Sequence, residues 1–413
     1  MSKKHLLVVG VGSRPYNRFY LERLSQHGYE ITLITKKYQF WFKDIVDHLI
    51  YCDPLDEHAC VQAAKEQHHV NPFDGVFVYS EPFVRTASYI ASSLHLPGLP
   101  VSVANRCRNK YLMRTAFHVA GMRGPKFLLA PNYQQIPDMV HQMEYPVVVK
   151  PAEASSSIAV MKLNSDQDLT AYMEQYATIP KDLNFKGEMA QSFLIEEYLP
   201  GLEASIDAFV LGDNIIPLMV CEKVLPMEGP LFLEEIFLSP PRYSDDVIHR
   251  LKECNERAIR ALDIPFGVTH VEFRIVDGEP YVIEAAARPG GLQLPIMIEH
   301  LTGLNLPVLM AELATGIAKV PQFHIQSYAA MRKIFAPKTG QVTQLTGLSE
   351  CMDHPNIREV TVFTKIGEQV YAIPHPNGFR PNIATVIALG RTAEECLESL
   401  MEASTQIIVE VNE

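Results

Sequence analysis

Residues 268–291 have the sequence VTHVEFRIVDGEPYVIEAAARPGG, and this stretch decides the interpretation of the chain. Apolar and polar residues alternate on both sides of Asp277-Gly278, a dipeptide typical of a tight hairpin turn. Two antiparallel strands are therefore predicted, with Val271, Phe273 and Ile275 on one face of the first strand.

The length of the turn decides whether two carboxylates meet. A three-residue loop over 277–279 gives these opposed pairs: Phe273 with Ile283, Ile275 with Tyr281, and Glu272 with Glu284. Cross-strand Cβ atoms lie about 5 Å apart, so two facing carboxylates need a cation between them. Such hard oxygen ligands suit Mg²⁺, which leaves its remaining positions to water and phosphate. A two-residue loop instead shifts the register by one and turns the two glutamates to opposite faces.

Arg288 follows Glu284 by four residues and can bring positive charge to the same phosphates. The alternative is an ordinary surface hairpin, in which Glu272 and Glu284 form exposed ion pairs with Arg274 and Arg288. The rest of the chain has to decide between the two.

The bulk properties exclude several classes of protein. A length of 413 residues predicts two to four domains. The net charge of −12 argues against general nucleic-acid binding, which needs a basic surface. Seven scattered cysteines without a C-x-x-C pair indicate neither zinc nor a disulfide framework and favour a reducing, cytoplasmic location. No apolar run approaches 18 residues, so no membrane span is predicted, and the short apolar start is better explained as a buried strand than as a signal peptide.

The first hundred residues alternate between the two kinds of secondary structure. Strands are predicted at 6–9, 31–35 and 75–79, and helices at 16–27, 57–68 and 84–94. This alternation predicts a doubly wound parallel sheet. Gly10-Val11-Gly12 suggests a dinucleotide site, but Pro15 occupies the place of the third glycine, so a tight turn bordering a ligand cleft is the better interpretation.

Two basic segments follow in this acidic chain. A helix predicted over 102–120 carries Arg106, Arg108, Lys110 and Arg114, either as a binding feature or as a solvated basic face. A β-branched strand then ends in Lys150 and leads into Ser155, Ser156 and Ser157. Lysine supplies point charge, and hydroxyl and backbone N–H groups supply donors, so this segment is either a phosphate clamp or a hairpin with a polar tip.

A strand over 193–199 ends at Pro200-Gly201, where the backbone of Tyr198 and Leu199 is expected to be free to bond a planar heterocycle. Glu203 lies just beyond, within reach of a ribose. A later strand ends at Lys223, either a substrate contact or a surface lysine. The Pro-rich stretch 224–245 contains Glu228, Glu234 and Glu235 and is predicted to be a loop over a cleft.

Taken in order, these segments resemble the ATP-grasp superfamily, in its biotin-carboxylase-like branch. The resemblance covers about residues 100–320. It implies a multidomain α/β and α+β fold with three parts: a doubly wound N-terminal domain (1–101), an ATP-grasp domain (102–320) with a mobile lid (126–195), and a C-terminal mixed αβ domain (321–413).

The resemblance also implies roles for individual residues. Lys110 and Lys150 would hold the ATP phosphates, under a loop that contains Ser155, Ser156 and Ser157. The adenine edge would be taken by Glu196, Glu197, Tyr198 and Leu199, and the ribose by Glu203. Glu272 and Glu284 would hold one or two Mg²⁺ ions, for which Mn²⁺ would be a substitute. Arg288 would contact the γ-phosphate and the developing acyl phosphate, which makes Arg288, Lys150 and Glu284 the expected catalytic set. Substrate contacts are expected at Lys223, Arg288, Gly290 and Gly291.

Two positions depart from the family pattern. Ala286 stands where the family usually has an asparagine that helps bind the second metal ion. The covering loop normally contains glycine, whereas residues 154–159 are Ala-Ser-Ser-Ser-Ile-Ala. The loop is therefore expected to be stiffer, or the lid to hinge elsewhere.

The Ala-Ala-Arg ending and the glycine turn after it resemble the L-amino-acid ligases. These enzymes join two amino acids into a dipeptide through an acyl phosphate and release ADP and phosphate. The expected partners are therefore small carboxylate and amine substrates, without nucleic acid or membrane; a homodimer through the first domain is common in related enzymes. Two alternatives stay open: an ATP-grasp carboxylase or formate-dependent transferase of nucleotide biosynthesis, and a non-catalytic nucleotide-binding protein.

Overall fold

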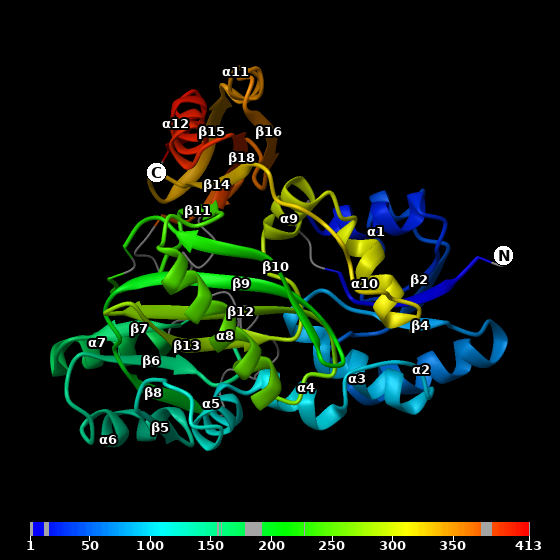
Figure 1. The fold of residues 1–413 in the computed structure, drawn as a ribbon, viewed down its shortest axis with the longest axis horizontal. Helices are drawn as coiled ribbons and strands as arrows, with labels where there is room; N and C mark the ends of the chain where they lie inside the picture. Colours follow the sequence, from blue (N-terminus) through cyan, green and yellow to red (C-terminus); the bar gives the residue numbers. More distant parts are fainter. Residues whose placement is uncertain are drawn as a thin grey trace.

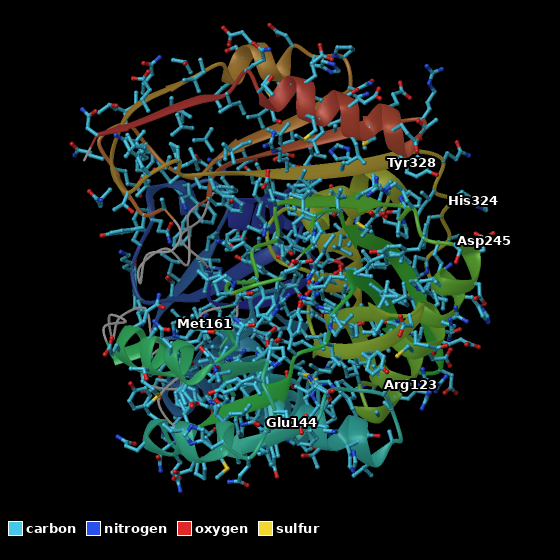
Figure 2. All side chains as sticks on the ribbon, turned by 90° about the vertical axis from the view of Figure 1, so that its left-hand side faces the viewer. Arg123, Glu144, Met161, Asp245, His324 and Tyr328 are labelled. Atoms are coloured by element: carbon cyan, nitrogen blue, oxygen red, sulfur yellow. The ribbon has the colours of Figure 1, made fainter. Side chains whose placement is uncertain are left out.

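A computed structural model describes residues 3–11, 16–154, 157, 159–177, 192–226, 228–372 and 382–412. Figure 1 shows an N-terminal α/β part, a large central sheet, a small lid sheet beside it, and a C-terminal part into which the central sheet continues. In Figure 2, Tyr328 at the start of the C-terminal strands lies in the upper half of the view and Glu144 in the lid lies in the lower half. This arrangement confirms the predicted multidomain α/β class.

The N-terminal part is a parallel sheet with helices packed against it. Its strands, in the order β3-β2-β1-β4, are His48–Tyr51, Glu30–Thr35, His5–Val9 and Gly75–Phe77. The helices are α1 Tyr16–Gln26, α2 Glu57–Val70 and α3 Val84–Ser93, with 3₁₀ turns η1 Phe40–Phe42 and η2 Glu81–Phe83. The doubly wound prediction is confirmed, although β3 was not predicted because this short, half-exposed edge strand lacks a continuous apolar run.

One predicted helix is wrong. Residues 102–120 form two helices, α4 Val101–Arg108 and α5 Lys110–Val119, because Asn109 between them is extended. Its side chain caps α5 by accepting hydrogen bonds from the N–H groups of Tyr111 at 3.0 Å and Leu112 at 3.1 Å. The break places Lys110 at the first position of α5.

The lid is a four-stranded antiparallel sheet with helices at its edge. Its strands, in the order β5-β8-β6-β7, are Phe127–Ala130, Phe193–Glu197, Val147–Pro151 and Met161–Leu163. The lid also contains η3 Tyr133–Gln135, α6 Ile136–Val140 and α7 Asp166–Ala177. The apolar residues of β6 and β8 are buried against α6 and α7, so the lid has a small core of its own.

The central sheet has eight strands and continues into the C-terminal part. In the order β13-β12-β9-β10-β11-β14-β18-β16 they are Glu279–Ala286, Phe266–Val276, Leu202–Leu211, Asn214–Lys223, Ile236–Ser239, Tyr328–Phe335, Asn382–Gly390 and Ile357–Val362. A three-stranded sheet, β17-β15-β19, consists of Gln369–Val370, Gly340–Thr346 and Ile408–Asn412. The predicted domain limits stay predictions, and strand pairing between β11 and β14 runs across residue 320.

Helices cover both faces of the central sheet. They are α8 Asp245–Ala261, α9 Leu294–Thr302, α10 Leu306–Ala314, α11 Leu348–Met352 and α12 Ala393–Ser404. Helix α8 turns one apolar face inward, since Leu251, Cys254, Ala258 and Ile259 are buried. Helix α10 lies between α1 and β4, and so joins the N-terminal part to the centre (Figure 1).

The decisive hairpin has a two-residue turn, not the predicted three-residue loop. Val276 pairs with Glu279, and Asp277 and Gly278 have φ values of 51° and 78°. The pairings predicted beyond the turn are therefore wrong: Phe273 faces Val282, Arg274 faces Tyr281, and Ile275 faces Pro280. A β-bulge then inserts Ile283 as an extra residue, which restores the pairing of Glu272 with Glu284.

Among the described residues, no single helix is long and apolar enough to cross a membrane. Only α9 and α10 taken together, across a bend of 100°, reach that length and hydrophobicity.

The cap of α5 gives a test of the helix break. Asn109→Ala removes the acceptor for the amides of Tyr111 and Leu112 and should weaken the first turn of α5 by about 1 kcal/mol. Hydrogen exchange should then be about fivefold faster at these two amides. Asn109→Ser keeps a capping oxygen and is the matched control; equal exchange in both variants would contradict the capping role.

Candidate active site

A cavity of about 440 Å³ lies where the lid, the central sheet and the N-terminal part meet. The predicted site residues that line it are Lys110, Lys150, Ser157, Glu196, Glu197, Tyr198, Leu199, Glu203, Lys223, Glu272, Glu284, Arg288, Gly290 and Gly291. Ser155 and Ser156 lie outside the described residues. The structure therefore brings together residues from the whole span between 110 and 291.

The paired carboxylates are each held by cations of the chain. Lys110 Nζ lies 3.0 Å from a Glu284 oxygen and donates to the Ala154 carbonyl at 2.6 Å. His270 Nε2 lies 3.4 Å from Glu272, and Lys223 Nζ lies 3.7 Å from it. Burial alone would raise the pKa of Glu272, but Lys223 and His270 hold that pKa well below its usual range. Glu272 is therefore ionised at neutral pH.

The donor set fits a magnesium ion that also binds phosphate. Glu272 and Glu284 supply two oxygen ligands from neighbouring strands, the number that Mg²⁺ usually takes from protein. No group of three or more His, Cys, Asp or Glu side chains among the residues described could hold a metal ion by itself. Ala286 is buried in the same strand and offers no side-chain donor, so further ligands have to come from phosphate and water.

Two residues behind the carboxylates were missed from the sequence. Asp207 on β9 is fully buried; one oxygen accepts a hydrogen bond from the amide of Gly290 at 2.6 Å, and the other lies 3.0 Å from His270 Nδ1. Burial would lower the pKa of His270, but Asp207 and Glu272 raise that pKa to about 9. Gly290 is needed here, since a Cβ would lie 2.9 Å from His270 Nδ1. For His270, the available sequence signal was its place two residues before Glu272 on the same predicted strand. Nothing in the sequence pointed to Asp207.

Lys223 is buried at the centre of three carboxylates and is not a surface lysine. Its Nζ lies 3.0 Å from Glu203, 2.6 Å from Glu234 and 3.7 Å from Glu272. Burial alone would lower the pKa of Lys223, but these carboxylates raise it well above its usual value. Glu203, the predicted ribose contact, also pairs with Arg274 at 2.6 Å.

Glu234 extends this cluster to the C-terminal part of the chain. Its second oxygen lies 3.1 Å from Lys333 Nζ on β14. Burial would raise the pKa of Glu234, but Lys223 and Lys333 lower it to about 2. The segment before β11 is thus fixed at the cavity, which Phe232, Leu233 and Glu234 line. The loop predicted over 224–245 is wrong for residues 236–239, which form the strand β11.

The predicted adenine edge has a more specific geometry than expected. The Glu196 carboxylate is buried between Lys150 and Arg114, with Arg114 Nη2 at 2.6 Å, so it neutralises these cations. The Tyr198 amide donates to the Pro146 carbonyl at 3.2 Å and is therefore not free, contrary to the prediction. The Tyr198 ring stacks near Phe232, with Lys162 Nζ 3.9 Å from the centre of the Tyr198 ring.

Arg288 is oriented by a glutamate that the sequence analysis did not single out. Its Nε donates to Glu81 Oε2 at 2.7 Å and its Nη1 to the Pro289 carbonyl at 2.7 Å. The other Glu81 oxygen accepts from Arg108 at 2.9 Å. Burial would raise the pKa of Glu81, but Arg288 and Arg108 lower it to about 2.

The loop without glycine contains two residues in a conformation that favours glycine. Ser157 and Ala159 have φ values of 54° and 56°. Left-handed backbone costs an L-residue roughly 1–2 kcal/mol. Ser157 and Ala159 thus adopt the left-handed backbone conformation that glycine adopts more easily.

Comparison with known proteins agrees with this geometry. The ATP-grasp domain family matches residues 143–295, and the L-amino acid ligase C-terminal domain 2 family matches residues 332–412. The L-arginine-specific L-amino acid ligase of Bacillus subtilis is 22% identical over 88% of this chain and 88% of its own length. The alanine–anticapsin ligase of Bacillus subtilis is 24% identical over 58% of this chain and 53% of its own. The chain covers about 53–60% of the length of the first curated relatives that it matches.

The fold agrees as well. A crystal structure of an L-amino acid ligase from Bacillus licheniformis has a TM-score of 0.86 at 22% identity, over 100% of this chain and 99% of that one. Residues 143–295 therefore match an ATP-grasp domain, and residues 332–412 match the C-terminal domain 2 of the L-amino acid ligases. These matches bear out the resemblance inferred from the motifs.

The buried Glu196 cluster gives a stability test. Glu196→Ala leaves Lys150 and Arg114 buried without a carboxylate and should lower the free energy of unfolding by about 3–5 kcal/mol, measured by urea denaturation. Glu256→Ala, which breaks an exposed pair with Arg260 (2.9 Å), should cost less than about 1 kcal/mol. Equal losses would contradict the role given to Glu196.

Proposed function

We propose that the protein is an ATP-dependent carboxylate–amine ligase that joins two L-amino acids into a dipeptide. The observation that carries the proposal is one cavity in which paired glutamates, three lysines and Arg288 surround a position suited to a triphosphate. The L-amino acid ligase C-terminal domain supports the choice within the superfamily. The names of the relatives give different substrates. They therefore do not identify the two amino acids that this chain would join.

In the proposed reaction, a carboxylate oxygen of the first amino acid attacks the γ-phosphorus of ATP, and ADP leaves. Lys110, Lys150 and Lys223 bind the phosphates, and Arg288 stabilises the charge on the transferring group. Mg²⁺ held by Glu272 and Glu284 would supply further neutralisation of the phosphate oxygens. Gly290, Gly291 and Arg288 border the place where the acyl phosphate forms.

In the second step, the neutral amine of the other amino acid attacks the acyl carbon. The bond between this carbon and the bridging oxygen breaks, and phosphate leaves with that oxygen. The amine proton has to go to a base or to water. Glu234 is a poor acceptor, because Lys223 and Lys333 hold its pKa at about 2. Glu222 is bound by Arg242 through both its oxygens. The contacts of Glu234 and Glu222 therefore favour an amine that binds already deprotonated; after the attack its nitrogen releases one proton to water and keeps the other in the amide.

The first experiment is phosphate release from Mg-ATP by the purified chain. All twenty L-amino acids are supplied singly and in pairs, with bicarbonate and formate in separate wells. Release that requires amino acids, with the dipeptide identified by mass, supports the ligase. Release with bicarbonate or formate alone indicates a carboxylase or a transferase, and ATP binding without release in any well indicates a nucleotide-binding protein.

The metal assignment is tested by Glu284→Gln. The variant keeps the shape of the side chain and its place opposite Glu272, but lacks one of the two charges that would hold Mg²⁺. Turnover should fall by at least about a thousandfold, and calorimetric binding of Mn²⁺ in the presence of ADP should weaken. Glu279→Gln, on the same strand but exposed, is the control. Normal turnover of Glu284→Gln would contradict the metal site.

A further inference from the structure

The cavity is lined by apolar residues as well as by the charged residues described above. Five of its lining residues belong to one hydrophobic cluster, and we refer to them as the apolar wall: Tyr20, Tyr79, Phe237, Leu292 and Leu294. The rings of Tyr20 and Tyr79 stack at 4.0 Å with planes 12° apart. Large aromatic and aliphatic surfaces of this kind are typical of pockets that bind apolar groups.

The apolar wall and Arg288 line the same cavity of about 440 Å³. Glu81, which accepts the Arg288 Nε hydrogen bond, follows Tyr79 of the apolar wall by two residues. Leu292 of the apolar wall follows Arg288 by four residues. An amino acid whose carboxylate reaches Arg288 therefore lies in the cavity that the apolar wall borders.

The charges around the cavity are already matched within the chain. Each glutamate that lines it, apart from Glu197, has a lysine, arginine or histidine of the chain at ion-pairing distance. Glu197 lies at the lid end and accepts a hydrogen bond from the Lys126 amide at 3.2 Å. Within the described part of the chain, a lysine or arginine side chain bound at the apolar wall would thus find no spare carboxylate.

An acidic side chain has no better partner there. Within the described part of the chain, Arg288 lines the cavity, and in the proposed reaction it is engaged by the α-carboxylate or the transferring phosphate. Lys333 approaches Phe237, 5.0 Å from its ring centre, but pairs with Glu234. An unpaired charge in such a site carries a large desolvation cost.

We infer that one of the two amino acids carries a large uncharged side chain, aromatic or branched aliphatic, and that the apolar wall selects it. This inference rests on the proposed ligase function and specifies its substrate class. Basic and acidic amino acids are excluded from this position because they would be buried without a counterion.

Turnover and binding are measured together, so that the two proposals can fail separately. Phenylalanine, tyrosine, leucine or isoleucine should drive ADP release with a kcat/KM at least about tenfold above that of lysine, arginine or glutamate. A ligase that works only with charged amino acids overturns the inference and leaves the function intact. Phenylalanine binding by calorimetry in the presence of Mg-ADP, without turnover, supports the apolar wall and contradicts the ligase. Binding of none of these amino acids overturns both.

A charge placed at the apolar wall tests its position. Asn17 is buried, lines the cavity and precedes Tyr20 by three residues on α1, so the two side chains lie on the same side of the helix. Asn17→Asp should lower kcat/KM for the apolar amino acid and raise the lysine-to-phenylalanine ratio by about tenfold. Gln26→Glu makes the same amide-to-acid change on an exposed position of α1, and its ratio should stay within about twofold.

A ratio in Asn17→Asp equal to that of Gln26→Glu would overturn the inference. If Asn17→Asp does not fold, Leu292→Asp makes the same test from another segment that lines the cavity. Leu292 has a φ of 57°, a left-handed conformation that aspartate adopts more readily than leucine.

Discussion

The facing carboxylates of Glu272 and Glu284 are the constraint on which the rest of the site depends. Two like charges on directly opposed strand positions repel each other, so the fold has to deliver cations to them. Lys110 arrives from the first position of α5, Lys223 from the end of β10, and His270 from the strand of Glu272 itself. The helix break at Asn109 and the three-carboxylate cluster around Lys223 both follow from this requirement.

The β-bulge that pairs the glutamates also ties the lid to the central sheet. An extra residue in β13 disturbs the regular hydrogen bonding of the strand and leaves carbonyls to be satisfied. Arg114 donates to the carbonyls of Val282 at 2.6 Å and Ile283 at 2.8 Å, while its Nε donates to Glu196 of the lid at 2.8 Å. One buried arginine therefore couples the geometry of the hairpin that carries Glu272 and Glu284 to the strand that leads into the expected adenine site.

The sequence predicted the elements of the site better than their connections. The alternating hairpin, the strand ending in Lys150 and the strand before Pro200 were visible because each depends on local periodicity and turn residues. The turn length was wrong, yet the Glu272–Glu284 pairing held, because a bulge compensates for the shorter turn. Glu81 and Asp207 were missed because their partners are remote: Arg288 lies 207 residues from Glu81, and Gly290 lies 83 residues from Asp207. No local pattern encodes such contacts.

The charge pairs within the cavity have a consequence for binding a highly charged ligand. When phosphates approach Lys223, they compete with Glu203, Glu234 and Glu272 for the same ammonium group. Each of these glutamates has a second cation: Arg274 for Glu203, Lys333 for Glu234, and His270 for Glu272. Lys223 can therefore turn toward phosphate without leaving a buried carboxylate unpaired, which would otherwise offset much of the gain. Because Lys333 lies on β14, the C-terminal strands contribute directly to this balance, although they contribute none of the expected phosphate-binding residues.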